Sequence, residues 1–444
     1  MTLDQVKEFV ATNGIDFFLC SFVEMSGMPK AKVVPVTHLD DMASEGAGFA
    51  GFAAGNMGQG PHDSDMMNIP DFNSMTVLPW RKNTAWVAGN IQVEGVPFGY
   101  CPRTILQRQL AKAEAKGYRL NLGVEAEFIL LKKDDQGNYA LADPMDTLEK
   151  PCYDLVTLHR NLDVMTTLIG YMQELGWEPY ANDHEDANCQ FEINWTYSDA
   201  MTTADRQTFF RWMVKVNAER HGYHATFMPK PFSHLTGSGA HYHMSLWDPE
   251  NRTNLFLDES DENGLSKEAY WFMAGILNHA KAISAVSAPL VNSYKRLTRG
   301  APRSGASWAP ICITYGGSNR TQMVRIPDGG RIENRAIDGA ANPYLTAAAM
   351  LAAGLDGIEN RMEPGERNEG NLYEVPESEL RARGIDLLPG TLAEAADHLA
   401  SDDVLREALG TEYADYYVQV KREEWAEYHL HVDQWERERY LPVY

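Results

Sequence analysis

The segment Gly-Val-Glu-Ala-Glu-Phe at residues 123–128 carries two carboxylates, Glu125 and Glu127, within an otherwise apolar stretch. In an extended strand, residues i and i+2 project from the same face, so both carboxylates point in one direction. Adjacent negative charges in apolar surroundings repel each other and lose hydration unless a cation lies between them. An exposed strand face is the alternative, but the apolar residues around the pair favour a central strand. The segment therefore predicts a buried β-strand whose polar face binds a metal ion.

Two further segments place polar side chains on one face in the same way, and a fourth segment adds two carboxylates. The side chains on one face are His241 and His243 in residues 237–245, and Arg331, Glu333 and Arg335 in residues 330–335; the added carboxylates are Glu185 and Glu192 in residues 183–192. A single strand histidine is more often a core residue than a ligand, but two on one face favour a ligand role. Several carboxylates with one histidine suit Mg²⁺ or Mn²⁺, whereas a structural zinc site normally has more cysteine and histidine. We therefore expect a divalent-metal site.

Arginines gather around the segment that contains Glu333. They are Arg296, Arg320, Arg325, Arg331 and Arg335. Arginine binds phosphate or carboxylate through two parallel hydrogen bonds, although arginines at strand ends often form surface pairs of little energy. The chain lacks the Gly-x-x-x-x-Gly-Lys-Ser/Thr motif, so any use of ATP is not of the P-loop kind. The arginines suggest a phosphorylated or carboxylate substrate.

Length and composition restrict the class of protein. With 444 residues, of which 44% are hydrophobic, the chain can form one large and one smaller domain around a substantial core. Asp and Glu number 62 against 39 Lys and Arg, and this excess of negative charge works against binding nucleic acid or anionic membranes. The five cysteines contain no Cys-x-x-Cys, so no disulfide framework is indicated. The N-terminal sequence has no apolar signal-peptide region and no apolar run could span a bilayer, so we expect a cytoplasmic protein.

The order of predicted elements divides the chain near residue 100. Residues 3–13 predict an amphipathic helix, and residues 15–36 predict two strands around a turn at residues 26–29, so residues 1–100 form a small α+β module. Pro102 begins a helix, which opens the second domain at residues 101–444. In that domain, strands alternate with helices at about 158–175, 201–221, 266–287, 342–358, 391–399, 402–408 and 412–428. This pattern predicts an α+β protein with a mainly antiparallel sheet.

In their order along the chain, these segments resemble the glutamine synthetase family. The matching segments, besides those at 123–128 and 237–245, are Asn-Ser-Tyr-Lys-Arg-Leu (292–297), Ser-Asn-Arg (318–320), Arg-Ile-Glu-Asn-Arg (331–335) and Ala-Asn-Pro-Tyr (341–344). The resemblance covers about residues 10–444 and is nearest to the subgroup that includes γ-glutamylmethylamide synthetases. It implies an N-terminal β-grasp module and a C-terminal catalytic domain. It also implies a homododecamer of two stacked hexameric rings with active sites shared between neighbours, and a C-terminal tail (435–444) that ties the rings together.

The resemblance further implies the role of each site residue. Two or three Mg²⁺ or Mn²⁺ ions would be held by Glu127, Glu185 and Glu192 on one side and by Glu125, His241 and Glu333 on the other. ATP would contact His243, Ser245, Arg320, Arg325 and Arg331. L-Glutamate would contact Gly237, Arg296 and Arg335, and the catalytic residues would be Arg296, Arg320, Arg335 and Glu185. ATP would phosphorylate the γ-carboxylate of glutamate, and an amine would then displace phosphate.

Three positions depart from the family pattern. Thr236 replaces an asparagine that contacts glutamate, Pro302 aligns near a glutamate of a flap, and Ala50 stands at an aspartate. In the family, the last two carboxylates hold and deprotonate ammonium. Their replacement predicts methylamine as the amine, because a less charged and more apolar pocket favours a substrate with a methyl group. The product would be γ-glutamylmethylamide.

Three alternatives remain open. The chain could be a glutamine synthetase whose ammonium site is rebuilt from Asp63, Asp65 or Asp186. It could also be a structural relative without catalysis or an amine-binding sensor, but the complete set of carboxylates with His241 argues against both. Tyr373 aligns where some family members are adenylylated, and a plain surface tyrosine is the expectation here.

Overall fold

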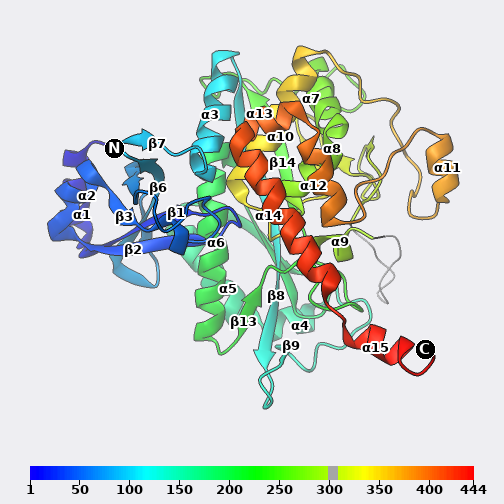
Figure 1. Cartoon of the computed structure of the whole chain (residues 1–444), viewed down its shortest axis with the longest axis horizontal. Helices are drawn as coiled ribbons and strands as arrows, with labels where there is room; N and C mark the ends of the chain where they lie inside the picture. The colour runs from blue at the N-terminus through cyan, green and yellow to red at the C-terminus, as the bar shows by residue number, and fades with distance from the viewer. Residues whose placement is uncertain (299–308) are drawn as a thin grey trace.

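The computed structural model describes residues 1–298 and 309–444 and contains two β-sheets with helices packed around them (Figure 1). The smaller sheet has the strand order β2-β1-β6-β4-β3, and β5 and β7 pair with β6. Its strands are β1 (Phe17–Val23), β2 (Pro29–Pro35), β3 (Ala47–Phe49), β4 (Met66–Pro70), β5 (Thr76–Leu78), β6 (Arg81–Val93) and β7 (Val96–Pro97). β1 and β6 run parallel at its centre. This sheet forms the expected N-terminal β-grasp module.

Two helices cover the smaller sheet. Thr2 is the N-cap of α1 (Leu3–Asn13), and its side chain accepts a hydrogen bond from the Gln5 N–H in a capping box. Val6 of α1 and Leu39 of α2 (Leu39–Glu45) are buried with Phe18 of β1 in one apolar cluster. Burial of this apolar stripe holds both helices on the sheet.

The larger sheet is mainly antiparallel, as the sequence predicts. Its strand order is β10-β11-β8-β14-β17-β16-β15, with β9, β12 and β13 pairing β8; only β15 and β16 run parallel among its described pairs. The strands are β8 (Arg119–Lys133), β9 (Tyr139–Leu141), β10 (Pro179–His184), β11 (Gln190–Trp195), β12 (Ser198–Asp199), β13 (His224–Thr226), β14 (Ala240–Trp247), β15 (Tyr315–Gly316), β16 (Val324–Arg325) and β17 (Ile332–Asn334). The α+β fold class is therefore confirmed.

Helices surround this sheet, and most lie where the sequence predicts them. They are α3 (Pro102–Ala115), α4 (Leu155–Arg160), α5 (Leu162–Glu174), α6 (Ala200–Arg220), α7 (Lys267–Asn278), α8 (Ala280–Ser287), α9 (Ser293–Arg296), α10 (Pro343–Glu359), α11 (Glu377–Ala382), α12 (Leu392–Ala400), α13 (Asp403–Leu409), α14 (Thr411–Leu430) and α15 (Gln434–Tyr440). Two predictions need correction, because the helices expected at 158–175 and 266–287 are each divided. The breaks fall at Asn161 and at His279, whose ring is fixed between two carboxylates.

α10 forms the centre of the helical layer and packs against α7, α3, α13, α6 and α8. Small residues let it approach α7 closely. A Cβ atom added to Gly275 of α7 would lie 2.0 Å from the backbone oxygen of Ala353. Asn342 caps the first turn of α10 and also donates from its side chain to the backbone oxygens of Glu24 and Met25. The helix therefore ties the catalytic domain to the small module.

A buried ion-pair network also joins the two sheets. Arg103 of α3 donates to Asp71 of the small module and to Asp205 of α6, at distances of 2.8–3.0 Å. The Arg103 side chain is only 3% exposed, so replacement of either carboxylate would leave a buried charge partly unpaired. The boundary at residue 100 stays a prediction; β7 ends at Pro97 and α3 begins at Pro102.

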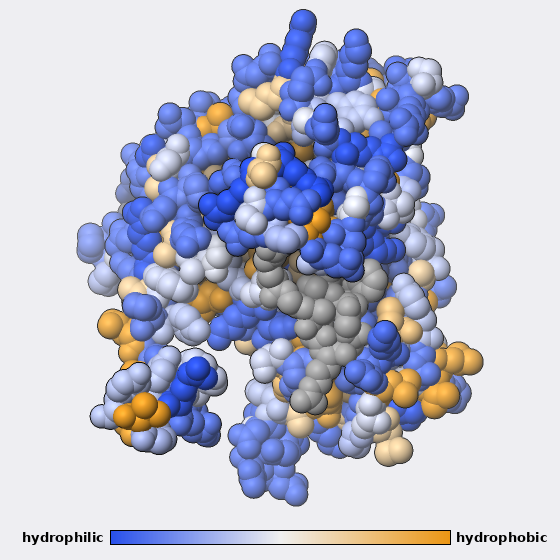
Figure 2. Space-filling model, turned by 90° about the vertical axis from the view of Figure 1, so that its right-hand side faces the viewer, coloured by the Kyte–Doolittle hydropathy of each residue, from blue (hydrophilic) through white to orange (hydrophobic). Residues whose placement is uncertain are grey.

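The C-terminal tail lies far from the small module (Figure 1). It exposes apolar side chains. The exposed hydrophobic residues of the tail are Trp435, Tyr440, Leu441, Val443 and Tyr444, and Leu430 and Val432 just before it are also exposed. On this side of the molecule, hydrophobic side chains gather along the lower part of a mostly hydrophilic surface (Figure 2). Among the described residues, no helix combines the length and apolar content that crossing a membrane requires.

Candidate active site

The register of four neighbouring strands brings the predicted polar side chains together. Glu127 on β8 is paired with Glu192 on β11, and Glu125 on β8 is paired with His241 on β14. On the far side of β14, His243 is paired with Glu333 of β17. Directly paired residues on antiparallel strands have their Cβ atoms about 4.5–5.5 Å apart. The sheet thus turns side chains that are distant in sequence into one row of charged groups.

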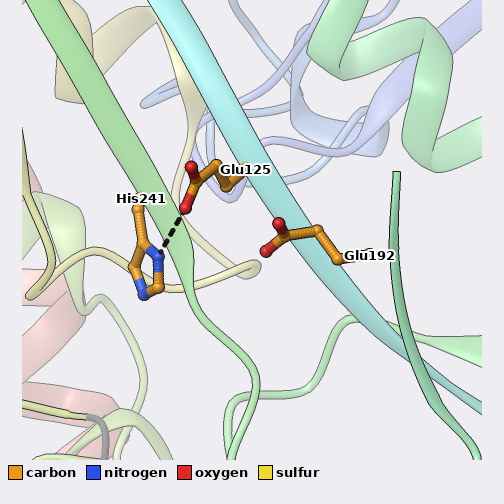
Figure 3. Close-up of side chains that lie close together, drawn as sticks. All are labelled: Glu125, Glu192 and His241. Carbon is orange, nitrogen blue, oxygen red and sulfur yellow. Dashed lines mark hydrogen bonds and ion pairs between the residues drawn. The ribbon is translucent and has the colours of Figure 1, made fainter. Parts of the chain in front are cut away.

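This row contains three groups of possible metal ligands, and within each group the ligand atoms all lie within 4.8 Å of one another. The groups are Glu125, Glu192 and His241; Glu125, His243 and Glu333; and Asp183, Glu185 and Glu192. In Figure 3 the side chains of the first group point toward one another from adjacent strands. The grouping differs from the one implied by the resemblance, because His243 and Asp183 take part while Glu127 does not. Glu127 instead accepts hydrogen bonds from the Gln190 side chain at 2.9 Å and from the Gly239 N–H at 2.8 Å.

The electrostatics of these groups fit divalent cations. Burial, together with the charges of neighbouring carboxylates, raises the pKa values of Glu185 and Glu192 well above their usual range. Burial also raises the pKa of Asp183 to about 6, with the charges of Glu127 and Glu125 contributing. Buried carboxylates that repel one another are stabilised in the ionised form by a bound cation. Oxygen-rich sets with a single imidazole are the donors that Mg²⁺ and Mn²⁺ prefer.

Two carboxylates at the other end of the row are ionised through nearby donors. Burial opposes the ionisation of Glu125, but hydrogen bonds with His241 and His243, at 3.2 and 2.9 Å, hold its pKa far below the usual range. Burial also opposes ionisation of Glu333, but the charge of Arg335 lowers its pKa to about 2. Both carboxylates can therefore act as charged ligands throughout the physiological pH range.

The arginines lie beside these carboxylates. Arg335 and Arg325 donate to the two oxygens of Glu333 at 2.5 and 2.7 Å. Arg296 donates from Nη2 to the backbone oxygen of Arg335 at 3.1 Å. Gly237 and Gly239 leave room for this arrangement, because a Cβ atom on Gly239 would lie 2.6 Å from Arg296 Nη2. The requirement for glycine is stronger at Gly237, where a Cβ atom would lie 2.4 Å from the backbone oxygen of Pro229.

Two cavities open along the row. The first, of about 480 Å³, is lined by the carboxylates of β8, β10 and β11 and by Arg296, Arg320 and Arg335. The second, of about 530 Å³, is lined by His243, Ser245 and Arg331 and by the aromatic rings of Tyr197 and Trp247. Glu125 and Tyr180 border both cavities, so a ligand could extend from one into the other. This shape fits an elongated substrate whose charged part lies near Glu125.

Known proteins resemble this chain in sequence and fold over nearly its whole length. The family model for the catalytic domain of glutamine synthetase matches residues 99–440. The chain belongs to the glutamine synthetase family. It is 44% identical over 443 residues to a glutamine synthetase of Rhizobium leguminosarum bv. phaseoli, and 43% identical over 447 residues to a glutamate–methylamine ligase of Methyloversatilis universalis; both alignments cover 100% of each chain. A solved structure of GmaS with ADP superposes with a TM-score of 0.92 at 49% identity, covering 98% of this chain and 99% of that one.

Membership of the glutamine synthetase family makes the protein an ATP-dependent ligase with small-molecule substrates. Family members use divalent metal ions, and the carboxylate groups described above provide a fitting donor set. The assignment of each residue to metal, ATP or glutamate stays a prediction. Arg325 differs from the other predicted ATP contacts, because it lines neither cavity and is bonded to Glu333.

The sequence analysis did not identify three residues that the structure places at the candidate site. Asp183 is paired with Glu192 across β10 and β11 and joins the third ligand group. Gln190 donates to Glu127, and Lys230 lines the first cavity, where burial and the charge of Arg296 lower its pKa. The two prolines that flank Lys230, shortly before Gly237, were a signal that could have found it.

The departures from the family pattern lie in different places. Thr236 lines the first cavity and donates a hydrogen bond to Asp186. Ala50 precedes the short 3₁₀ helix Gly51–Ala53 and borders neither cavity of its own chain. Pro302 falls outside the described residues. The expectation for Tyr373 needs correction, because its hydroxyl oxygen is buried rather than exposed at the surface.

Proposed function

We propose that this enzyme joins methylamine to the γ-carboxylate of L-glutamate, giving γ-glutamylmethylamide, ADP and phosphate. The observation that carries the proposal is the composition of residues 46–62, which contain no Asp or Glu. Ala50 replaces the family's ammonium-binding aspartate in this segment, and the nearby Phe52 side chain is 54% exposed. An apolar, uncharged segment suits a methylated amine better than ammonium.

The chemistry follows from the groups that line the first cavity. The oxygen of a carboxylate is a poor leaving group, so ATP must first convert it into an acyl phosphate. Arg296, Arg320 and Arg335 supply fixed positive charge where the phosphoryl group gains negative charge during transfer. Divalent cations, when bound at the carboxylate groups, neutralise phosphate charge in the same region. The amine then attacks the acyl phosphate and phosphate leaves.

The preference for methylamine has a limited but measurable size. Burial of one methyl group contributes about 0.8 kcal/mol, which is a preference of roughly fourfold. Loss of the carboxylates that replace the hydration of ammonium adds to this preference. Both amines must lose a proton before attack, and the group that accepts it stays unassigned; Asp186, Asp65 and Glu185 are the candidates.

A glutamine synthetase that uses ammonia is the second candidate. The Rhizobium relative with that name is as similar to this chain as the methylamine ligase is. In addition, Asp186 is 6% exposed and lies beside the first cavity through its bond to Thr236, so it offers a carboxylate from which an ammonium site could be rebuilt.

The proposed active site is completed by a neighbouring subunit. None of the described residues that line the two cavities comes from residues 1–100. If Ala50 and Phe52 shape the amine site, they must therefore belong to another copy of the chain. This observation supports an oligomer whose sites are shared between subunits; that the oligomer is a ring-shaped homododecamer rests on the family resemblance alone.

An amine panel tests the proposal. ATP turnover is measured with saturating glutamate and Mg²⁺ and with methylamine, ethylamine or ammonia at one pH. A kcat/KM for methylamine at least several-fold above that for ammonia supports the proposal. A clear preference for ammonia would contradict the proposal and support the function of a glutamine synthetase. No turnover with any amine would contradict both candidate functions.

A further inference from the structure

Tyr373 lies in a turn whose geometry buries its hydroxyl group. The Asn371 side chain accepts a hydrogen bond from the Tyr373 N–H at 3.1 Å, and the neighbouring Leu372 is 1% exposed. These contacts anchor the turn and direct the phenol ring inward. Its hydroxyl oxygen is buried and has no hydrogen-bond partner among the described residues.

The inward-pointing hydroxyl lies close enough to the two substrate-site arginines to be influenced by their charges. Burial raises the pKa of Tyr373 to about 12, while Arg335 and Arg296 act in the opposite direction. The phenol therefore keeps its proton at physiological pH and can donate a hydrogen bond.

Arg296 also has a buried donor without a hydrogen-bond partner among the described residues. Its Nη2 donates to the backbone of Arg335, but its Nη1 is buried without a hydrogen-bond partner among the described residues. Buried polar groups in folded proteins are nearly always paired, and each exception requires an explanation. Here two unpaired donors come from separate segments, the end of α9 and the turn before α11.

An ionised carboxylate satisfies both donors. It only accepts hydrogen bonds, and its two oxygens offer about four positions for them. A hydroxyl or amine ligand would bring its own donor hydrogens toward a guanidinium group and a phenol that need acceptors. The two donors therefore require an anion that only accepts hydrogen bonds, and the carboxylate of glutamate is the group that the test below separates from the phosphates of ATP.

We propose that the Tyr373 hydroxyl donates a hydrogen bond to a carboxylate of the substrate glutamate, beside Arg296. This inference rests on the proposed function, since it takes glutamate as the carboxylate substrate. It gives Tyr373 a role in substrate binding, which a surface tyrosine would not have. The enzyme would then bind the carboxylate of glutamate through a neutral hydroxyl donor as well as through arginines.

The test compares Tyr373→Phe with Tyr315→Phe, which also removes one phenolic hydroxyl. The Tyr315 hydroxyl already has a partner, the backbone oxygen of Gly365 at 3.3 Å, whereas the Tyr373 hydroxyl has none among the described residues, so the loss of the Tyr315 hydroxyl controls for a general effect of the substitution. Glutamate binding is measured by calorimetry with Mg²⁺ and a non-hydrolysable ATP analogue, and steady-state constants are measured with methylamine and with ammonia.

In Tyr373→Phe, the Kd and KM for glutamate should rise about tenfold, as expected for the loss of one hydrogen bond to a charged group. The KM for ATP and kcat should change little, because the lost contact forms already in the ground state. Tyr315→Phe should leave all constants near those of the wild type.

Two results would overturn the role of Tyr373. One is unchanged glutamate affinity in Tyr373→Phe, and the other is an equal loss of affinity for ATP analogue and glutamate, which would indicate a structural role. A wild-type enzyme that hydrolyses no ATP with glutamate and any amine would instead contradict the proposed function. The calorimetric and kinetic measurements thus separate the two failures.

Discussion

Glu127 on β8 and Glu192 on β11 face each other as a directly paired couple of an antiparallel ladder, and both are buried. Like charges in this position destabilise a sheet unless other groups compensate. Donors from Gln190 and Gly239 compensate Glu127, whereas Glu192 receives one hydrogen bond, from the Asn194 side chain at 2.8 Å. The carboxylates of Glu127 and Glu192 therefore repel each other at a place where a bound cation would stabilise both.

We expect Glu192→Gln to separate stability from activity. In the presence of a chelator, the variant should melt roughly 2 °C or more above the wild type, because a buried like charge is removed. With Mg²⁺, its ATP turnover should fall on the order of 100-fold, because a metal ligand is lost. Glu219→Gln on the exposed face of α6 is the control and should change neither value. Normal activity of Glu192→Gln at saturating Mg²⁺ would argue against its metal role.

The stabilising effect of Mg²⁺ should grow with pH. Glu185 and Glu192 have folded-state pKa values above their unfolded values, so the metal-free fold binds protons more tightly than the unfolded chain. Without metal, the contribution of these two groups to stability is therefore full below their unfolded pKa values and is lost as pH rises through their folded-state pKa values. Protons also compete with metal for the same oxygens. Melting curves with chelator or Mg²⁺ between pH 5.5 and 8 measure the difference, and a constant difference would contradict the expectation.

The His279 side chain should stabilise the helical layer below neutral pH. Its two ring nitrogens lie 2.6 and 3.0 Å from Asp402 and Asp356. Burial opposes its protonation, but these carboxylates raise its pKa above the unfolded value. The stabilisation is therefore complete below the unfolded pKa and is lost as pH rises through the folded pKa. At pH 6, His279→Gln should cost on the order of 3 kcal/mol, since it leaves two partly buried carboxylates without their partner.

Denaturant unfolding of His279→Gln at pH 6 and pH 9 tests this sign. The difference in the free energy of unfolding between wild type and variant should be smaller at pH 9 than at pH 6. His398→Gln on the exposed side of α12 serves as the control and should show no such pH dependence. A gap that widens with pH would mean that His279 is neutral in the fold.

Ala50→Asp should shift the amine preference toward ammonia. The new carboxylate would stand at the position that carries ammonium-binding aspartate in the family, and would replace part of the hydration of the ammonium ion. We expect the ratio of kcat/KM for ammonia to that for methylamine to rise about tenfold. Ala53→Asp adds the same charge at another exposed position of the 3₁₀ helix and should leave the ratio unchanged. Equal ratios in both variants would remove Ala50 from the amine site.

Deletion of residues 435–444 should reduce the size of the assembly. The exposed apolar side chains of the tail, among them Trp435 and Leu441, need a partner surface to bury them. We expect the full chain to form a dodecamer and the shortened chain to form hexamers that retain activity, as measured by mass photometry. An unchanged mass after deletion would exclude the tail as the connection between rings.

The sequence by itself determined which side chains share a strand face. Period-two spacing places Glu125 with Glu127 and His241 with His243 whatever the strands pair with, because successive residues of a strand alternate between its faces. Apolar periodicity likewise located α1 and α6 to within one residue, and Pro102 located the start of α3. These are local properties of the backbone, so the order of residues is sufficient to predict them.

Only the tertiary structure decided which of these side chains meet. The pairing of β8 with β11 and β14 sets the ligand groups, and it brings in Asp183, which no local pattern distinguished. The break at His279 also depends on a distant residue, because one nitrogen of its ring lies 2.6 Å from Asp402. Strand register and burial arise from such long-range packing, which the spacing of residues within one segment does not specify.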